Sequence, residues 1–268
     1  MSIHNSTSLT INIHNDGFFS NCSTRLHHLI EYFNTYKYLP IKFDSSNLFN
    51  HYKNNDDINK DITFVYFKDY KEISIPIKFD RYINYNGSHQ FSRFHRLDYE
   101  KLKPFIYKYF SPSDKILNIK KTIEDKYNID YDNICVLFHR GNDKATETIL
   151  PEYNDYVIYA NKILEIEKNN PNFKFLIQSD ETEFLDEMKK LYPNHIIFYD
   201  EIRHMPKQLS TVDVIFREKN HEFSKYFLAI MLIMSKCKYV ITGCGNCPMW
   251  VCLFRGNLNN IIDINKLY

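Results

Sequence analysis

The segment HRGNDK, residues 139–144, places an arginine, a lysine and an acid directly after the apolar run 134–138. A guanidinium at the end of a buried strand can bind a phosphate through two parallel hydrogen bonds, and Asp143 can hold Arg140 in position. Parallel α/β sheets bind ligands at such strand ends. The segment therefore predicts a phosphate subsite that includes His139 and Lys144, with a salt bridge on a surface loop as the alternative.

The glycine-containing segment TGCGNCP, residues 242–248, follows a later apolar run. Gly243 and Gly245 have no side chains, so the backbone N–H groups of the turn and of the next helix can approach an anion closely. Asn246 adds a polar side chain there. The segment is not a dinucleotide fingerprint, because Pro248 replaces the third glycine and the turn follows a late strand. We expect a second anion contact from it.

Two further polar segments follow expected strands. The segment QSDE, residues 178–181, brings Asp180 to a third strand end, although Ser179 or Asp180 as the N-cap of the next helix would equally explain these residues. The segment 15–24, which contains Gly17, joins the first strand to the first helix. Because it lies between those elements, it can line the facing side of a cleft.

The cysteines offer a different chemistry. Cys244 and Cys247 are spaced like a redox pair at the start of a helix. Zinc sites usually need a second such pair or two histidines at matching spacing, and Cys237 and Cys252 fall in a predicted helix end and a helix. Buried apolar thiols are the default for such residues, so we expect no metal site.

His27 and His28 are adjacent on a predicted helix. Neighbouring helical residues face different directions, so the two cannot form an i, i+4 ligand pair. We expect one of them to face the cleft and the other to pack against the protein.

Composition narrows the class of protein. The chain has 268 residues, a formal net charge of +1, and 21 residues each of Tyr and Phe. Near neutrality argues against nucleic-acid binding through bulk charge, and so much aromatic surface argues against disorder. No apolar run approaches the roughly 18 residues of a membrane span, and no signal peptide is apparent at the start. These features, with six scattered cysteines, predict a globular protein of a reducing compartment, hence cytoplasmic.

Strand-length apolar runs alternate with amphipathic stretches, which predicts an α/β protein with parallel strands. The predicted strands are 8–14, 39–44, 62–67, 73–79 (an edge strand because of Pro76), 134–138, 173–178, 196–199, 238–242 and 261–264. The predicted helices are 23–36, 99–110, 152–168, 181–191, 218–236 and 248–254, and 82–92 is predicted as a long loop. A boundary near residue 110 divides an N-terminal α/β domain, 1–110, from a clearer Rossmann-like domain, 111–268.

Taken together, these segments resemble the fucosyltransferase-like glycosyltransferases with two Rossmann-like halves (GT-B), especially the core α1,6-fucosyltransferases and nodulation fucosyltransferases. STRLHHLIEYF at 23–33 is similar to that family's first helix, and VLFHRGNDK at 136–144 is similar to its strand-end arginine motif. The stretch 173–193 resembles its strand, acidic pair and following helix. The stretch 235–246 resembles the elements that close its donor pocket.

The resemblance implies roles for individual residues. Arg140 would bind the β-phosphate of a nucleotide sugar, supported by Asp143 and Lys144. Asp180 would match the first acid of the family's pair, and the loop from Gly243 to Asn246 would contact the diphosphate. Glu147, just past the arginine motif, is the candidate general base. Gly17, His27 and His28 would lie on the acceptor side.

The chain also departs from the family pattern. Phe138 stands where the family has a histidine, Gly141 replaces a second arginine, and Ile230 falls at the position of a guanine-binding aspartate. These departures weaken the prediction of GDP as the nucleotide and fucose as the sugar more than they weaken the prediction of glycosyl transfer.

The sequence thus predicts an inverting, metal-independent glycosyltransferase of the cytoplasm (the host cytoplasm for a viral protein). GDP-fucose is the favoured donor, and a glycan or other hydroxyl compound is the acceptor. The nucleotide sugar is a co-substrate, and no cofactor, nucleic acid or membrane partner is expected. Two alternatives remain: an inactive nucleotide- or glycan-binding protein of the same fold, and a thiol-redox protein using Cys244 and Cys247.

Overall fold

The computed structural model describes residues 7–77, 81–91, 94–143 and 156–265. Its larger sheet has five parallel strands in the order β5-β4-β3-β6-β7. Their bounds are β3 Ile134–His139, β4 Lys174–Ser179, β5 His195–Ile196, β6 Tyr239–Thr242 and β7 Ile261–Asp263. The chain forms β3 first, then adds β4 and β5 on one side of it, and then returns to add β6 and β7 on the other side. The strand order therefore reverses between β3 and β6. Doubly wound folds bind ligands at that point.

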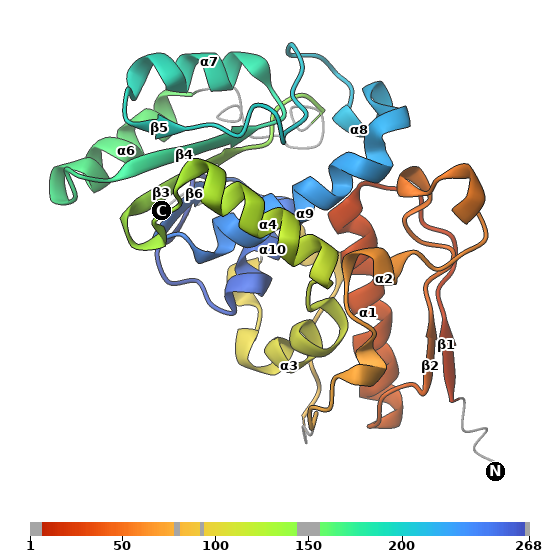
Figure 1. The fold of residues 1–268 in the computed structure, drawn as a ribbon. Coiled ribbons are helices and arrows are strands. Elements are labelled where there is room, and N and C mark those ends of the chain that lie inside the picture. Colours follow the sequence, from red (N-terminus) through yellow and green to blue (C-terminus); the bar gives the residue numbers. More distant parts are fainter. Residues whose placement is uncertain (1–6, 78–80, 92–93, 144–155, 266–268) are drawn as a thin grey trace.

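Helices cover both faces of this sheet (Figure 1). On one face lie α6 Val157–Asn169 and α7 Thr182–Leu191, whose side chains pack with alternate residues of β3 and β4 such as Leu137 and Ile177. On the other face lie α4 Asp114–Tyr127, α9 Asn220–Lys236 and α10 Asn246–Arg255. A short helix, α8 Val212–Ile215, follows β5.

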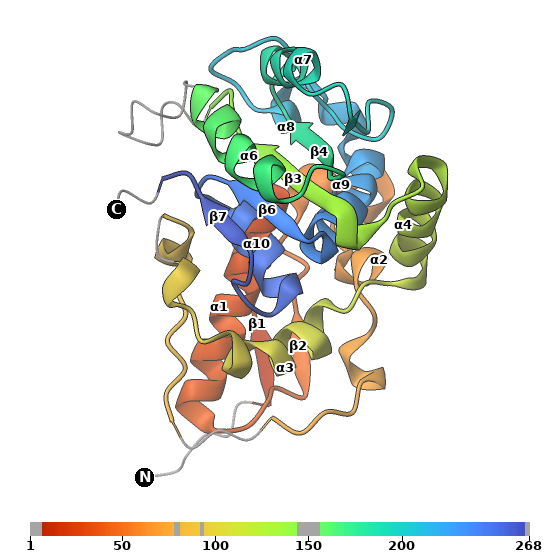
Figure 2. The same ribbon diagram turned by 90° about the vertical axis from the view of Figure 1, so that its left-hand side faces the viewer.

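The N-terminal part is a smaller α/β unit, seen at the opposite end of the molecule from α7 in Figure 2. Its two strands, β1 Ser8–Thr10 and β2 Lys42–Asp44, pair in parallel and are joined through α1 Phe18–Tyr36. Two more helices complete it: α2 Thr63–Tyr66 and α3 Tyr99–Phe110. The predicted α/β class with two parallel-stranded halves is confirmed, and the C-terminal half is the more complete one.

One hydrophobic cluster runs through both halves. At its centre Trp250 of α10 is fully buried, packs against Phe19 of α1 and Phe110 of α3, and donates its indole N–H to Ser23 at 2.9 Å. The halves therefore share a core. The division at residue 110 remains a prediction; α3 ends there and α4 begins at Asp114.

Two predicted strands were wrong. Most of the stretch 62–67 forms α2, because Tyr66 packs its ring against Phe18 and Phe49 and bonds Ser224 across the core. A short apolar run does not distinguish a strand from a buried helix by itself, and here tertiary packing decided. The described part of 73–79 has no regular structure, and the ammonium of Lys108 bonds a backbone carbonyl there instead of a neighbouring strand.

Helix α1 begins five residues earlier than predicted, at Phe18. Phe18 and Phe19 are fully buried in the core, so the helix extends to include them. The predicted loop 15–24 is thereby reduced to residues 15–17 ahead of the helix. Among the described residues, no helix combines the length and apolarity needed to cross a membrane.

The shared core predicts a single unfolding transition. In urea, Trp250 fluorescence and far-UV circular dichroism should change together, because the tryptophan reports the junction and the dichroism reports both halves. Phe19→Ala should lower the free energy of unfolding by about 3–5 kcal/mol while the two signals still coincide. The exposed Phe64, as Phe64→Ala, is the control and should cost less than about 0.5 kcal/mol. Two separate transitions would contradict the shared core.

Candidate functional site

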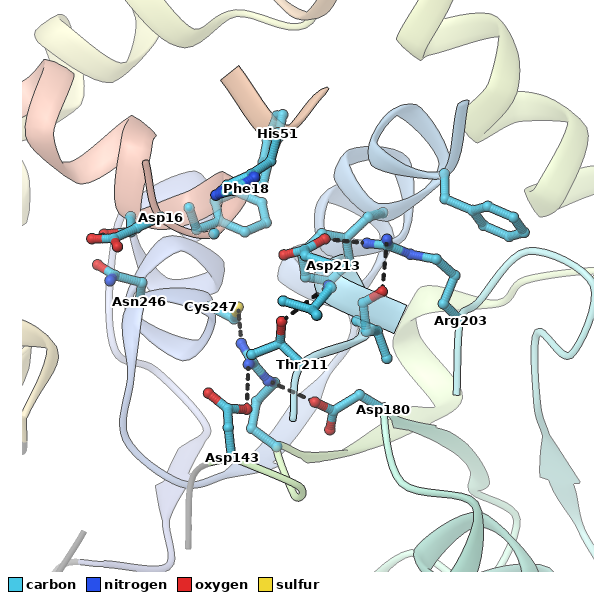
Figure 3. Close-up of a pocket in the computed structure, with 18 of the residues that line it drawn as sticks. Asp16, Phe18, His51, Asp143, Asp180, Arg203, Thr211, Asp213, Asn246 and Cys247 are labelled. Carbon is cyan, nitrogen blue, oxygen red and sulfur yellow. Dashed lines mark hydrogen bonds and ion pairs between the residues drawn. The ribbon is translucent and has the colours of Figure 1, made fainter. Parts of the chain in front are cut away.

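A cavity of about 660 Å³ opens at the carboxyl edge of the large sheet. Its lining comes from both halves of the molecule. The C-terminal half contributes the ends of β3 and β4, the segment 201–217, α9 and the start of α10, and the N-terminal half contributes the start of α1 with His51, Gln90 and Phe91. Figure 3 shows Asp16, Phe18 and His51 apart from Asp143 and Asp180. The strand-end residues predicted from the sequence as phosphate ligands follow strands that end at this edge.

Arg140 leaves the end of β3 and is held by three partners. Its Nε donates to Asp180 Oδ2 at 3.3 Å, its Nη1 to Cys247 Sγ at 3.0 Å, and its Nη2 lies 3.6 Å from Asp143 Oδ1. Burial by itself lowers the pKa of Arg140, but Cys247 and the two carboxylates outweigh it and raise the pKa well above its usual value. The guanidinium is therefore a permanent cation at the cavity wall; Figure 3 labels its three partners Asp143, Asp180 and Cys247.

The carboxylates of Asp180 and Glu181 hold the loop that follows this arginine, and we call these two residues the carboxylate clamp. Asp180 Oδ1 accepts the Gly141 N–H at 2.9 Å, Glu181 Oε2 accepts the Asn142 N–H at 3.3 Å, and the Asn142 amide donates to the Asp180 carbonyl at 2.7 Å. A Cβ on Gly141 would stand 2.1 Å from Glu181 Oε2, so only glycine fits. The arginine that the family has at this position is thus sterically excluded while Glu181 stays in place.

Glu181 itself is fully buried and occupies the N-cap of α7, so the prediction of Ser179 or Asp180 as the N-cap was wrong. Burial raises the pKa of this carboxyl, but His139, Lys207 and the Asn142 N–H outweigh burial and lower it. The Lys207 Nζ lies 3.6 Å from Oε1. The acid is therefore a charged structural anchor beneath the cavity.

The start of α10 lines the cavity through Asn246 and Cys247. The Asn246 side chain is engaged at both ends: its Oδ1 accepts from Ser23 at 2.6 Å and its Nδ2 donates to Gln90 Oε1 at 2.7 Å. The Gly245 N–H donates to the Gln90 carbonyl at 2.7 Å. Part of the loop predicted to bind an anion therefore joins the two halves. The first N–H groups of α10 still mark a helix start that favours anions.

The segment after β5 contributes a polar network that the sequence analysis missed. Arg203 forms an ion pair with Asp213 at 2.7 Å (Figure 3). Asp213 Oδ2 also accepts from Tyr52 of the N-terminal half at 2.7 Å. Both charged residues line the cavity, and so does Arg217. The signal that would have found them is the rule already used for β3, β4 and β6, applied to the strand end at β5.

Among the residues predicted from sequence, the structure brings together five on the cavity lining: Gly17, Arg140, Asp143, Asp180 and Asn246.

Several other residues that the sequence predicted for the site are not among the described lining residues. His139 is fully buried and stacks on Phe184 with ring centroids 4.6 Å apart. Gly243 and Gly245 are buried beside the lining. His27 and His28 are half-buried on α1 near Glu31, with Nε2 of His27 3.3 Å from its carboxylate, and neither is among the lining residues. Lys144 and Glu147 lie outside the described residues.

The charged side chains of the lining are mostly acidic. It carries three arginines and five carboxylates: Arg140, Arg203, Arg217, Asp16, Asp143, Asp180, Glu201 and Asp213. Over the described ranges, no group of three or more His, Cys, Asp or Glu residues is arranged to hold a metal ion. The positive side chains of the described lining include the three arginines, and the start of α10 adds the positive end of a helix dipole.

No protein-family model and no curated protein sequence matches the chain. Among solved structures it is similar to a NodZ α1,6-fucosyltransferase soaked with GDP-fucose, at 14% identity over 59% of this chain and 48% of that one, with a TM-score of 0.40. It is also similar to a NodZ α1,6-fucosyltransferase co-crystallised with GDP, at 15% identity over 49% of this chain and 38% of that one, with a TM-score of 0.32. For the fucosyltransferase NodZ from Bradyrhizobium, the identity is 13% over 88% of this chain and 85% of that one, and the TM-score is 0.40. The chain spans less than half of the first two solved proteins, and no sequence family is shared.

The clamp predicts that any side chain at position 141 destabilises the protein. Gly141→Ala should lower the free energy of unfolding by about 1–3 kcal/mol, because the new methyl group must displace the Glu181 carboxylate. Gly87→Ala is the matched control, since nothing lies within 4 Å of a Cβ there. Urea titrations of both variants measure the difference. Equal stability of the two would contradict the clamp.

Cys247 is the one of the six cysteines that lines the described cavity. Burial raises the pKa of Cys237 and of Cys252 to about 12, which leaves almost no reactive thiolate at neutral pH. A thiol reagent such as DTNB should therefore modify Cys247 first in the folded protein. Peptide mass spectrometry identifies the site, and Cys247→Ser should remove this first phase. Modification of Cys237 or Cys252 before Cys247 would count against the assignment.

Proposed function

We propose that the protein is a glycosyltransferase that moves a sugar from a nucleoside diphosphate to a hydroxyl group of a glycan or similar acceptor. The observation that carries this is the fixed cation of Arg140 beside the start of α10, in a cavity at the point where strand order reverses. The motif resemblance around Arg140 favours a GDP-linked donor with fucose as the sugar.

In this proposal Arg140 binds the diphosphate and stabilises the charge that builds on it as the glycosidic bond breaks. The phosphate would take over the guanidinium edge that faces Asp143, the most distant of its three partners at 3.6 Å. One well-placed donor to a developing charge is worth about 3–4 kcal/mol in comparable sites. The positive end of α10 would act on the same group.

The acceptor would attack the anomeric carbon in line, so the configuration would invert. We propose transfer without a metal ion, with Arg140 and the helix start supplying the positive charge. Lys144 as a second phosphate ligand and Glu147 as the general base remain proposals from the sequence.

The rest of the cavity suits the nucleoside. Phe223, Phe227 and Ile230 of α9 form an apolar wall against which a base or ribose can pack. Ile230 replaces the aspartate that the family uses for guanine, but the same lining includes the carboxylate of Asp213. We propose that the base lies between this wall and the segment 201–217.

A second candidate is a protein of this fold that binds a glycan or nucleotide without transferring sugar. The observation that favours it is the acidic excess of the lining, because a cavity with more carboxylates than arginines suits neutral sugar hydroxyls better than two phosphates. A thiol-redox function is less well supported, since it needs both cysteines of the pair, and Cys244 is only 4% exposed and is not among the lining residues.

Calorimetric titration with GDP, UDP, CDP, GDP-fucose and UDP-glucose tests the donor class. We expect GDP and GDP-fucose to bind selectively, and Arg140→Ala to weaken binding about 10–100-fold, the equivalent of about 1.5–3 kcal/mol for a charged hydrogen bond. Arg81→Ala is the control, because this exposed arginine lies outside the cavity lining.

Two outcomes would redirect the assignment. If no nucleotide binds, or if Arg140→Ala binds as tightly as the wild type, the phosphate subsite is wrong. If GDP-fucose binds but no GDP is released over hours with water or added glycans as acceptors, the second candidate is correct. Thermal unfolding of Arg140→Ala shows whether the variant is folded at the assay temperature.

A further inference from the structure

Three polar side chains at the start of α1 form a compact cluster on the N-terminal side of the cavity. The His14 Nε2 lies 3.0 Å from Asp16 Oδ2 and 3.0 Å from Ser20 Oγ, and the Ser20 hydroxyl donates to Asp16 Oδ2 at 3.4 Å. Because a carboxylate only accepts, the imidazole presents its Nε2–H to Asp16. One oxygen of Asp16 thus receives two donors, and its orientation is fixed.

The other oxygen, Oδ1, has no hydrogen-bond partner among the described residues, and the Asp16 side chain is 61% exposed. Asp16 and Ser20 belong to the cavity lining, and His14 is not among the lining residues. The backbone holds the position as well: the Asn21 amide donates to the Asp16 carbonyl at 2.7 Å. Asp16 therefore offers a free carboxylate oxygen to whatever enters from this side.

The position of Asp16 in the cavity is opposite to that of the phosphate subsite. Arg140 follows β3 of the C-terminal half, and Asp16 stands just before α1 of the N-terminal half. In Figure 3, Asp16 lies apart from Asp143 and Asp180, the two acids that pair with Arg140. The neighbouring Gly17 comes so close to α8 that its Cβ would lie 3.7 Å from Asp213 Oδ2. A sugar linked to a phosphate at Arg140 would thus lie between the two walls, with Asp16 on its far side.

We propose that Asp16 is the general base of the transfer, positioned by His14 and Ser20; this rests on the proposed glycosyl transfer. The acceptor hydroxyl gives its proton to Asp16 Oδ1 as its oxygen bonds to the anomeric carbon. The bond from that carbon to the diphosphate breaks, and its electron pair leaves with the phosphate oxygen at Arg140. The carboxylate later returns its proton to solvent, which its exposure allows.

His14 is a positioning residue in this scheme. It touches Asp16 without lining the cavity, and its hydrogen bond holds the carboxylate so that Oδ1 stays toward the acceptor. Two other histidines lie near: His28 on α1 interacts electrostatically with His14, and His51 after β2 bonds the backbone carbonyl of Asn15. Asp16 is thus the acid of this cluster that faces the cavity.

The experiment compares two nucleophiles. Wild type, Asp16→Asn and His14→Gln are incubated with the donor that titration selects from GDP-fucose and UDP-glucose, with water or with sodium azide as the acceptor. Water must lose a proton to attack, but azide has none to lose. We expect Asp16→Asn to slow release of the nucleoside diphosphate in water about 10²–10⁴-fold, and to react with azide at close to the wild-type rate. His14→Gln should show the same pattern with a smaller loss.

Asp125→Asn is the matched control, since Asp125 is 66% exposed, is paired with Lys121 and lies outside the cavity lining. It should match the wild type with both nucleophiles. Mass spectrometry of the glycosyl azide confirms that azide attacked the sugar. Equal binding of the donor by Asp16→Asn in calorimetry shows that the variant is folded and keeps its donor subsite.

Each remaining outcome is decisive. If Asp16→Asn reacts with water at the wild-type rate, or loses both reactions equally, Asp16 is not the base. If instead Glu147→Gln alone loses the water reaction and keeps the azide reaction, the base is Glu147 and the proposal for Asp16 is overturned. A wild type that binds the donor but reacts with neither nucleophile overturns the transfer itself, a result distinguishable from a failure of Asp16.

Discussion

The ends of β3 and β4 meet so closely that the backbone of Gly141 lies directly against the carboxylate of Glu181. The Asp180 carboxylate accepts the backbone N–H of Gly141, and the Glu181 carboxylate accepts that of Asn142. Two loops that would otherwise move separately become one unit, and Arg140 leaves that unit in a fixed direction. A preorganised cation requires no reorganisation when a negative charge develops nearby, which is the main electrostatic requirement of phosphate-leaving chemistry. The whole candidate site depends on this contact.

A second constraint sets the width of the cavity. Asn246 at the start of α10 bonds Ser23 of α1 and Gln90 of the 3₁₀ turn Gly87–Gln90, and Trp250 packs beneath them. The same helix start that contacts Arg140 through Cys247 is therefore tied to the N-terminal half. These bonds connect the half that carries Asp16 to the half that carries Arg140. Reactions between two substrates gain much of their rate from such fixed placement.

The charges of the lining also shape which ligands can enter. Arg140 already interacts with Asp143, Asp180 and Cys247. An anion that binds there must therefore interact with the guanidinium more strongly than the partner it displaces. In the proposed function, a diphosphate would meet that condition through its two phosphate groups, and the start of α10 would add to it. A weakly charged ligand would leave the arginine with its internal partners. This arrangement favours ligands whose charge is concentrated at one end, with a polar or aromatic remainder.

The local pattern of the chain determined the parallel sheet of the second half and its polar strand ends, because a buried strand needs a continuous apolar run and its ligand-binding residues must follow that run. Arg140, Asp143 and Asp180 were found in this way. The sequence did not determine that 62–67 folds as α2, that α1 begins at Phe18, or that Arg203, Asp213 and Tyr52 meet across the halves. Only tertiary structure decided these, since a short apolar run suits either a strand or a helix until its neighbours are in place. Contacts between loops far apart in sequence likewise depend on how the two halves pack.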